Sequence, residues 1–290
     1  RRFLKVDDDR VHGFAETNIT LTTSADGVTN GKLFIDVTDA QLDLPSLRWN
    51  KVPGNPGKAA ISLVLKDGIP VGNPTFKFDS GQFHVRGNIE LNNQISVDAL
   101  VFELLEVGET RLSGRLNFEK DGGQEIQISA EYLDLRPYNG TSRIDQDKHV
   151  PIFGTAEKII LTDEISLAEA EGQLTQQNDG EITVKGRARE LDLRPYFKHN
   201  DDSTDLTENK EPKTPSTKLT GIISIERVLI DDHIQLSNLR GNARYDGDKF
   251  DLADIEIFVE NSDRIELQIT EHDTGRVLSI ASENAGAVLR

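Results

Sequence analysis

Acidic and histidine side chains come together at Asp231-Asp232-His233, the best local cluster of potential metal ligands in the sequence. Carboxylate and imidazole groups bind divalent cations, but a working site needs ligands that converge from several elements. The three residues separate one apolar segment that ends near Ile230 from another that starts at Ile234. We therefore predict a polar turn here and no metal site.

Other catalytic signatures are weak or missing in the sequence. Asp246-Gly247-Asp248 superficially resembles the start of a calcium loop, but the further acids and the distal glutamate are not there, so an Asp-Gly hairpin is the better interpretation. The chain has no cysteine, and the six histidines form no metal-binding spacing. No nucleophile elbow, phosphate loop or dinucleotide fingerprint is present. We expect neither a cofactor nor enzymatic activity.

The string Leu-Asp-Leu-Arg-Pro-Tyr occurs at residues 133–138 and again at 191–196. Proline lacks a backbone donor and fixes φ, so each copy should end a strand. Asp134 and Arg136 are two residues apart on one strand face, where they can form an ion pair. Two interpretations stay open: a corner that recurs because the architecture recurs, which we favour, or a binding motif for an anion.

The similarity extends beyond this string. Residues 112–138 and 170–196, aligned without gaps, share 11 of 27 positions. Repetition at a long period indicates tandem units that complete their cores against their neighbours. We predict one segment over residues 1–290, with units at roughly 82–138, 158–196 and 219–270 and a flexible polar loop at 199–218.

Apolar residues alternate with polar ones along most of the chain, as at Ile61-Leu63-Leu65 and Ile265-Leu267-Ile269. This pattern is typical of antiparallel strands that are apolar on one face only. The fold class we predict is all-β, with very little helix. The apolar face needs a cover: a second sheet, closure into a filled barrel, or a lipid-like ligand in an open trough. A filled core is the commoner outcome, yet aromatic residues make up only 6%, and a lining of Ile, Val, Leu, Ala and Gly suits acyl chains.

Charge narrows the range of partners. The 50 acidic and 33 basic residues give a formal net charge of −17, which repels phosphate backbones and anionic bilayers. We therefore expect no nucleic-acid partner and no peripheral docking on membranes. The chain has no methionine and no apolar run of about 18 residues. We interpret it as a fragment of a longer protein whose anchor or targeting segment lies outside it.

Three features resemble the AsmA-like proteins of Gram-negative bacteria, above all the large YhdP-type members. One is the Leu-Asp-Leu-Arg-Pro repeat at 133–137 and 191–195. Another is residues 281–290, which are similar to the family's S-x-D-A-G-x-L-L-R stretch but have Asn284 in place of Asp and Val288 in place of Leu. The third is the recurring Gly-x-Leu step, as at 114–116 and 172–174.

The resemblance implies an elongated, twisted antiparallel sheet that curls into an open, taco-like groove. It further implies a periplasmic location, an inner-membrane anchor outside this chain, unidentified envelope partners, and movement of phospholipid towards the outer membrane. A different class stays open: a non-enzymatic β-scaffold or assembly factor for outer-membrane biogenesis that binds a client protein. The residues predicted to line the groove are Ile126, Ile128, Ile165, Leu167, Ile182, Val184, Ile223, Ile225, Ile255, Ile257, Ile265, Leu267 and Ile269.

Overall fold

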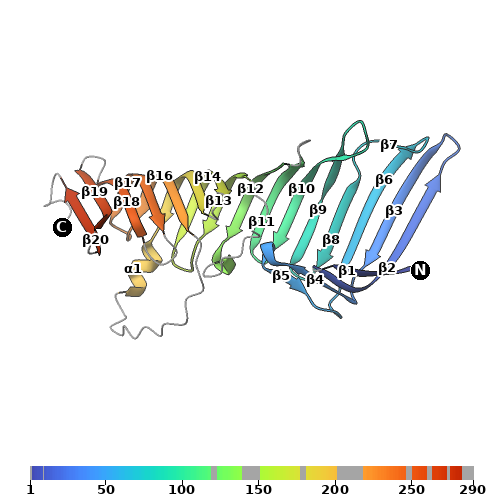
Figure 1. Ribbon diagram of the computed structural model, residues 1–290, viewed down its shortest axis with the longest axis horizontal. Coiled ribbons are helices and arrows are strands. Elements are labelled where there is room, and N and C mark those ends of the chain that lie inside the picture. Colours follow the sequence, from blue (N-terminus) through green and yellow to red (C-terminus); the bar gives the residue numbers. More distant parts are fainter. Residues whose placement is uncertain are drawn as a thin grey trace. The chain divides into compact units, whose positions relative to one another are not determined.

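The computed structural model describes residues 2–8, 10–118, 123–138, 151–176, 181–200, 218–245, 250–259, 263–272 and 275–282. Within these ranges every element is a β-strand except two short 3-10 turns and one helix of seven residues (Figure 1). The all-β prediction is therefore confirmed. The chain divides into two compact units, Arg1–Ser129 and Ala130–Arg290, which are described one at a time.

Unit 1 is built from strands and one 3-10 turn, and its last strand crosses into unit 2. The elements are β1 (Arg2–Asp8), β2 (Val11–Thr23), β3 (Val28–Asp36), β4 (Ala40–Leu44), η1 (Pro45–Leu47), β5 (Trp49–Lys51), β6 (Lys58–Lys66), β7 (Ile69–Pro70), β8 (Thr75–Ser80), β9 (Phe83–Leu91), β10 (Val97–Val107), β11 (Thr110–Phe118) and β12 (Gln124–Asp134).

The main sheet of unit 1 runs in the order β1-β2-β3-β6-β8-β9-β10-β11, with every pair antiparallel. Tight turns join many neighbours, because Asp-Gly sequences accept the backbone that such turns require. Gly27 and Gly68, for example, have φ values of 82° and 84°. The sheet is thus the antiparallel meander that the alternating sequence predicts.

Register partners lie on the same face of a sheet, so the pairing separates the two faces of unit 1. One row across β3, β6, β8, β9 and β10 is Leu33, Ile61, Phe76, Gly87 and Phe102. The adjacent row, on the opposite face, is Lys32, Ser62, Thr75, Asn88 and Val101. One face is therefore apolar and the other largely polar, as the alternation predicts.

After β12, unit 2 continues with further long β-strands. Its elements are η2 (Arg136–Tyr138), β13 (Ile152–Ile160), β14 (Ser166–Gln176), β15 (Ile182–Asp192), α1 (Arg194–Asn200), β16 (Leu219–Leu229), β17 (Gln235–Tyr245), β18 (Phe250–Val259), β19 (Asp263–His272) and β20 (Gly275–Ser282).

The sheet of unit 2 runs in chain order from β13 to β20, and one pair departs from the prediction. β15 and β16 are parallel, with Asp192 opposite Leu229, whereas β13–β14, β14–β15 and each pair from β16 to β20 are antiparallel. A parallel pair needs a crossover connection, and α1 begins that connection at Arg194, inside the second Leu-Asp-Leu-Arg-Pro-Tyr string. Period-two alternation is the same in both directions, so the sequence pattern could not distinguish them.

Three sequence predictions fall wholly or partly outside the residues that the structure describes. The predicted loop 199–218 begins inside α1, which reaches Asn200, and residues 201–217 lie outside the described residues. The Asp-Gly hairpin at 246–249 and the family-like stretch at 283–290 also lie outside them.

Glycines on the apolar face allow neighbouring strands to approach closely. A Cβ on Gly172 would lie 2.6 Å from the Lys185 carbonyl oxygen, and one on Gly241 would lie 2.2 Å from that of Asp254. Gly87 and Gly114 of unit 1 are in the same situation. Because these glycines share a face with the bulky aliphatic residues, each sheet has room to bend towards its apolar side.

Candidate functional site

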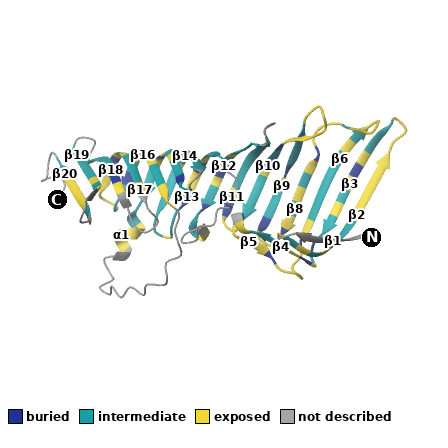
Figure 2. Ribbon diagram, viewed as in Figure 1, coloured by how far each residue is buried: buried dark blue, intermediate teal, exposed yellow. Residues whose placement is uncertain are grey.

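The apolar face of unit 1 is only partly covered by the protein. Leu33, Ile61, Phe76 and Phe102 are all half-buried, and towards the edge Leu21 is 65% exposed. Buried residues appear in Figure 2 as short, separate stretches of strand and not as a continuous layer. A filled sandwich or barrel would bury such side chains almost completely.

The apolar face of unit 2 has the same character. One row across β15 to β18 is Gly186, Ile223, Gly241 and Ile255, and it continues on β19 and β20 as Leu267 and Ile280. Ile223, Ile255 and Leu267 are half-buried, and Ile280 is 64% exposed. The hydrophobic residues that are buried in the described parts of both units are Ala15, Val37, Ala40, Phe83, Ala99, Ala130, Ala156, Ile160, Ile182, Ala188, Ile225, Val228 and Ala253.

The structure places the predicted lining residues as follows. In unit 2, the pairing puts Ile182, Val184, Ile223, Ile225, Ile255, Ile257, Ile265, Leu267 and Ile269 on one face. Ile182 and Ile225 are buried, 7% and 5% exposed, so they belong to the packed part of that face. Ile165 lies in the turn before β14, where its carbonyl oxygen accepts hydrogen bonds from the backbone of Leu161 and Thr162. Leu167, on β14 opposite Leu191, packs against the buried Ala188, Ile225 and Val228. Ile126 and Ile128 lie on β12 within unit 1, and Ile128 is in reach of a Cβ on Gly114.

Several residues of this face escaped the sequence prediction because the alternation changes phase within unit 2. The cluster of Ala188, Ile225 and Val228 also contains Leu191 and Leu236. Residues three apart, such as Ala188 and Leu191, normally point to opposite faces of a strand.

The change of phase coincides with a row of irregular backbone. The pairing skips Glu169 on β14, Arg189 on β15, Glu226 on β16 and Asn238 on β17. Glu169 and Asn238 have φ values of 49° and 51°, in the left-handed region that non-glycine residues rarely adopt. The row shifts the alternation by one residue on several strands together, so the apolar face continues across it. The apolar spacing of Ile225, Val228 and Ile230 was the available sequence signal.

Both Leu-Asp-Leu-Arg-Pro-Tyr strings form the same structure. Asp134 accepts hydrogen bonds from Arg136 Nε at 2.8 Å, from Arg136 Nη2 at 3.0 Å and from the Arg136 backbone at 3.0 Å. Asp192 accepts the corresponding three from Arg194, at 2.9, 2.8 and 3.0 Å. These bonds lower the pKa of both carboxyl groups, chiefly through the arginine side chain.

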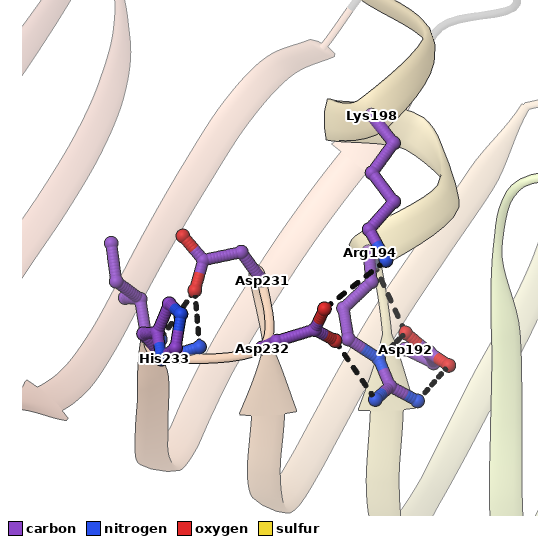
Figure 3. Close-up of polar contacts among 7 residues, drawn as sticks. Asp192, Arg194, Lys198, Asp231, Asp232 and His233 are labelled. Atoms are coloured by element: carbon purple, nitrogen blue, oxygen red, sulfur yellow. Dashed lines mark hydrogen bonds and ion pairs between the residues drawn. The ribbon is translucent and has the colours of Figure 1, made fainter.

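Each string also attaches to the strand beside it. Leu135 donates its backbone N–H to the carbonyl of Ile160, and Leu193 donates to the carbonyl of Leu229, both at 2.9 Å. The arginines then reach acids in the turn that follows that strand: Arg136 lies 2.9 Å from Asp163, and Arg194 lies 3.7 Å from Asp232 (Figure 3). The guanidinium groups therefore face carboxylates of the chain itself, which favours the recurring corner over an anion-binding motif.

Asp231, Asp232 and His233 form the predicted turn. Asp231 Oδ1 accepts hydrogen bonds from the backbone N–H groups of His233 and Ile234, each at 2.6 Å, and the bond from His233 is the main cause of its lowered pKa. Asp232 instead pairs with Lys198 of α1 at 3.3 Å (Figure 3). The carboxylates thus serve the turn and α1. Among the described residues, no three His, Cys, Asp or Glu side chains are grouped to hold a metal ion.

Comparisons of the chain with protein-family models, with curated proteins and with solved structures found no match. In the part of the chain that the structure describes, no helix has the length and apolar character needed to cross a membrane. The class that the fold defines is thus an all-β protein whose strands present one apolar and one polar face.

Proposed function

We propose that the apolar faces of the two units bind the acyl chains of phospholipids, and that the chain is part of a bridge-like lipid transporter. The observation that carries this proposal is the row of half-exposed aliphatic and aromatic side chains, such as Ile61 and Phe76 in unit 1 and Ile223 and Ile255 in unit 2. These faces have the chemistry of a core without the covering layer.

The benefit to a lipid is energetic. Each methylene group withdrawn from water contributes about 0.8 kcal/mol, so two long tails gain tens of kcal/mol from an aliphatic wall. The polar face of unit 2 carries ion pairs such as Arg187–Glu171 and Arg264–Glu256, at 2.6 and 2.9 Å, and stays hydrated. Binding along such a wall depends on tail burial, so we expect little selectivity for the headgroup.

The cellular setting follows from the family resemblance described above. It supports transport through the periplasm from the inner towards the outer membrane, with an inner-membrane anchor outside this chain. The −17 net charge fits a protein that shelters tails without lying on an anionic bilayer.

A second candidate is a β-scaffold that binds a client protein during outer-membrane assembly. The favouring observation is the exposure of apolar residues towards the sheet edges: Ile19 and Leu21 on β2 are 69% and 65% exposed, and Leu278 and Ile280 on β20 are 59% and 64% exposed. An exposed edge can accept a further strand from another protein.

Solvent extraction of the purified chain, followed by mass spectrometry of the extract, separates the two candidates. The lipid-transport proposal predicts co-purifying phospholipid, in amounts that fall when the apolar face receives a charge. Phospholipid at the level of an unrelated acidic control protein would contradict it and favour the scaffold.

A further inference from the structure

Residues 37–57, called the cap segment below, connect β3 to β6 by way of two short strands, β4 and β5. The segment begins after Asp36 and ends before Lys58, which are register partners on β3 and β6. Within it, β4 pairs with β2, where Leu42 lies opposite Val11, and β5 pairs with β4 (Figure 1). The cap segment is therefore an excursion from the common end of two paired strands.

This excursion covers one end of the apolar face. The ring of Trp49, on β5, lies 4.6 Å from the ring of Phe83 and 6.0 Å from that of Phe78, centroid to centroid. Phe83 is only 6% exposed, whereas Phe76, on the same face, is half-buried. Val37 and Ala40 add a buried cluster against Ile35, Leu42 and Phe78. The apolar face is covered here and left open further along the strands.

A buried lysine holds the cap segment together. Lys51 is 1% exposed, and its Nζ donates to the carbonyl oxygens of Ala40 at 2.8 Å, Thr38 at 2.9 Å and Val52 at 3.3 Å. These acceptors use all three N–H bonds of an ammonium group. Burial lowers the pKa of Lys51, and the nearby carboxylates of Asp39 and Asp36 oppose that shift.

The surrounding chain packs closely against the Lys51 side chain. A Cβ on Gly57 would lie 2.8 Å from Lys51 Cε and 2.8 Å from Val37 Cγ2. Val37 donates its backbone N–H to the Gly57 carbonyl at 2.9 Å, and Ser80 Oγ donates to the Pro56 carbonyl at 2.9 Å. The two ends of the segment thus bond to each other beside the Lys51 stem, and Ser80 of β8 bonds to the segment at Pro56.

We propose that the cap segment closes this end of the apolar face of unit 1 to any bound chain, and that the Lys51 ammonium is the latch that keeps it closed. Lys51 is a positioning residue: it touches no bound molecule but places Trp49 on Phe83. This proposal rests on the proposed function in one respect only: the molecules that the cap segment excludes are taken to be acyl chains.

The latch is tested with Trp49, the only tryptophan of the chain. In Lys51→Met the stem remains but the three donors are lost. We expect tryptophan emission to move to longer wavelength and acrylamide quenching to rise at least about twofold, because the cap opens locally. Lys77→Met, at an exposed position on the polar face of β8, is the matched control and should match the wild type.

Two outcomes would overturn the latch. One is a Lys51→Met protein whose Trp49 emission and quenching equal those of the wild type. The other is a hydrogen-exchange result. If Lys51 is the latch, amides of 37–57 exchange faster in Lys51→Met than in the wild type, while those of β9 and β10 keep their protection. An even increase across unit 1 would mean that Lys51 stabilises the whole sheet and not the cap.

The closing of the face is tested with phosphatidylcholine vesicles whose acyl chains carry bromine, which quenches tryptophan on contact. Trp49 should be protected in the wild type and quenched in Lys51→Met. In a Trp49→Phe background, the indole introduced by Phe76→Trp should be quenched with or without the latch. If Trp49 and the Phe76→Trp reporter are quenched equally in proteins that keep Lys51, the cap segment does not close this end of the apolar face. No quenching of the Phe76→Trp reporter would contradict the acyl-chain proposal, while emission and exchange still decide the cap.

Discussion

The carboxylate of Asp134 receives both the Nε and the Nη2 of Arg136, at 2.8 and 3.0 Å, although the two residues are only two positions apart. This geometry recurs at Asp192 and Arg194. In each copy the strand ends at the aspartate, and a helical segment begins two residues later at the arginine. The repeated string is therefore the corner at which a strand leaves the sheet, and after the second copy the crossover to β16 begins.

Removing this pair should destabilise unit 2. The Asp134 side chain is 10% exposed, so Asp134→Asn removes a nearly buried carboxylate that accepts two bonds from the Arg136 guanidinium, itself 32% exposed. We expect a loss of about 1–3 kcal/mol in the free energy of unfolding, measured in urea. Glu171→Gln, which breaks the well-exposed pair with Arg187, is the control and should be indistinguishable from the wild type. Equal effects of both changes would show that the corner has no special role.

The same pairs predict an acid dependence. The folded pKa values of Asp134 and Asp192 lie below the ordinary value of 3.8, so their stabilisation is complete above that value. It declines as the pH falls below it and is lost below the folded pKa. The difference in unfolding free energy between the wild type and Asp192→Asn should therefore shrink as the pH falls below about 4. A difference that stays constant from neutral to strongly acidic pH would contradict this assignment.

Glycine on the apolar face should matter only where strands approach closely. A Cβ on Gly241 would meet the Asp254 carbonyl oxygen at 2.2 Å, whereas one on Gly221 would have its nearest contact at 3.9 Å. We expect Gly241→Ala to cost about 1–3 kcal/mol and Gly221→Ala to be neutral or stabilising by up to about 1 kcal/mol. Thermal and urea unfolding of the two variants check this. The reverse order would contradict the close approach of the strands at Gly241.

A charge on the apolar face should reduce lipid binding without unfolding the protein. Val184 lies on the apolar face of β15, and Lys185, the next residue, is exposed on the other face. Val184→Asp should lower co-purifying phospholipid several-fold because the carboxylate would have to be desolvated beside an acyl chain. Lys185→Asp introduces the same group one position away and should leave the lipid content unchanged. Circular dichroism of both variants controls for folding.

Much of the fold could be predicted because the alternation is regular. Ile61, Leu63 and Leu65 share a face for the reason that any strand puts every second residue there. The parallel pairing of β15 with β16 could not be predicted, since it depends on where the crossover returns the chain. Val228 and Leu236 were missed because the row through Glu169 and Asn238 shifts the phase.

The packing of the cap segment could not be predicted from the sequence either. Residues 50–58, with two prolines and two glycines, indicate a polar break. That interpretation overlooks that Lys51 is buried against the carbonyls of Thr38 and Ala40. A lysine in this position satisfies its charge through backbone that is distant in sequence, and no local pattern encodes such contacts.

Site-specific photo-crosslinking to phospholipid at neighbouring positions tests the central claim most directly. A photoreactive side chain at Ile61, Ile128, Val184 or Ile255 should cross-link to lipid. The same group at Ala60, Gln127, Lys185 or Glu256, one position away on the other face, should not. Cross-linking that alternates residue by residue is the predicted result; equal yields on both faces, or none on either, would contradict an acyl-chain-binding face.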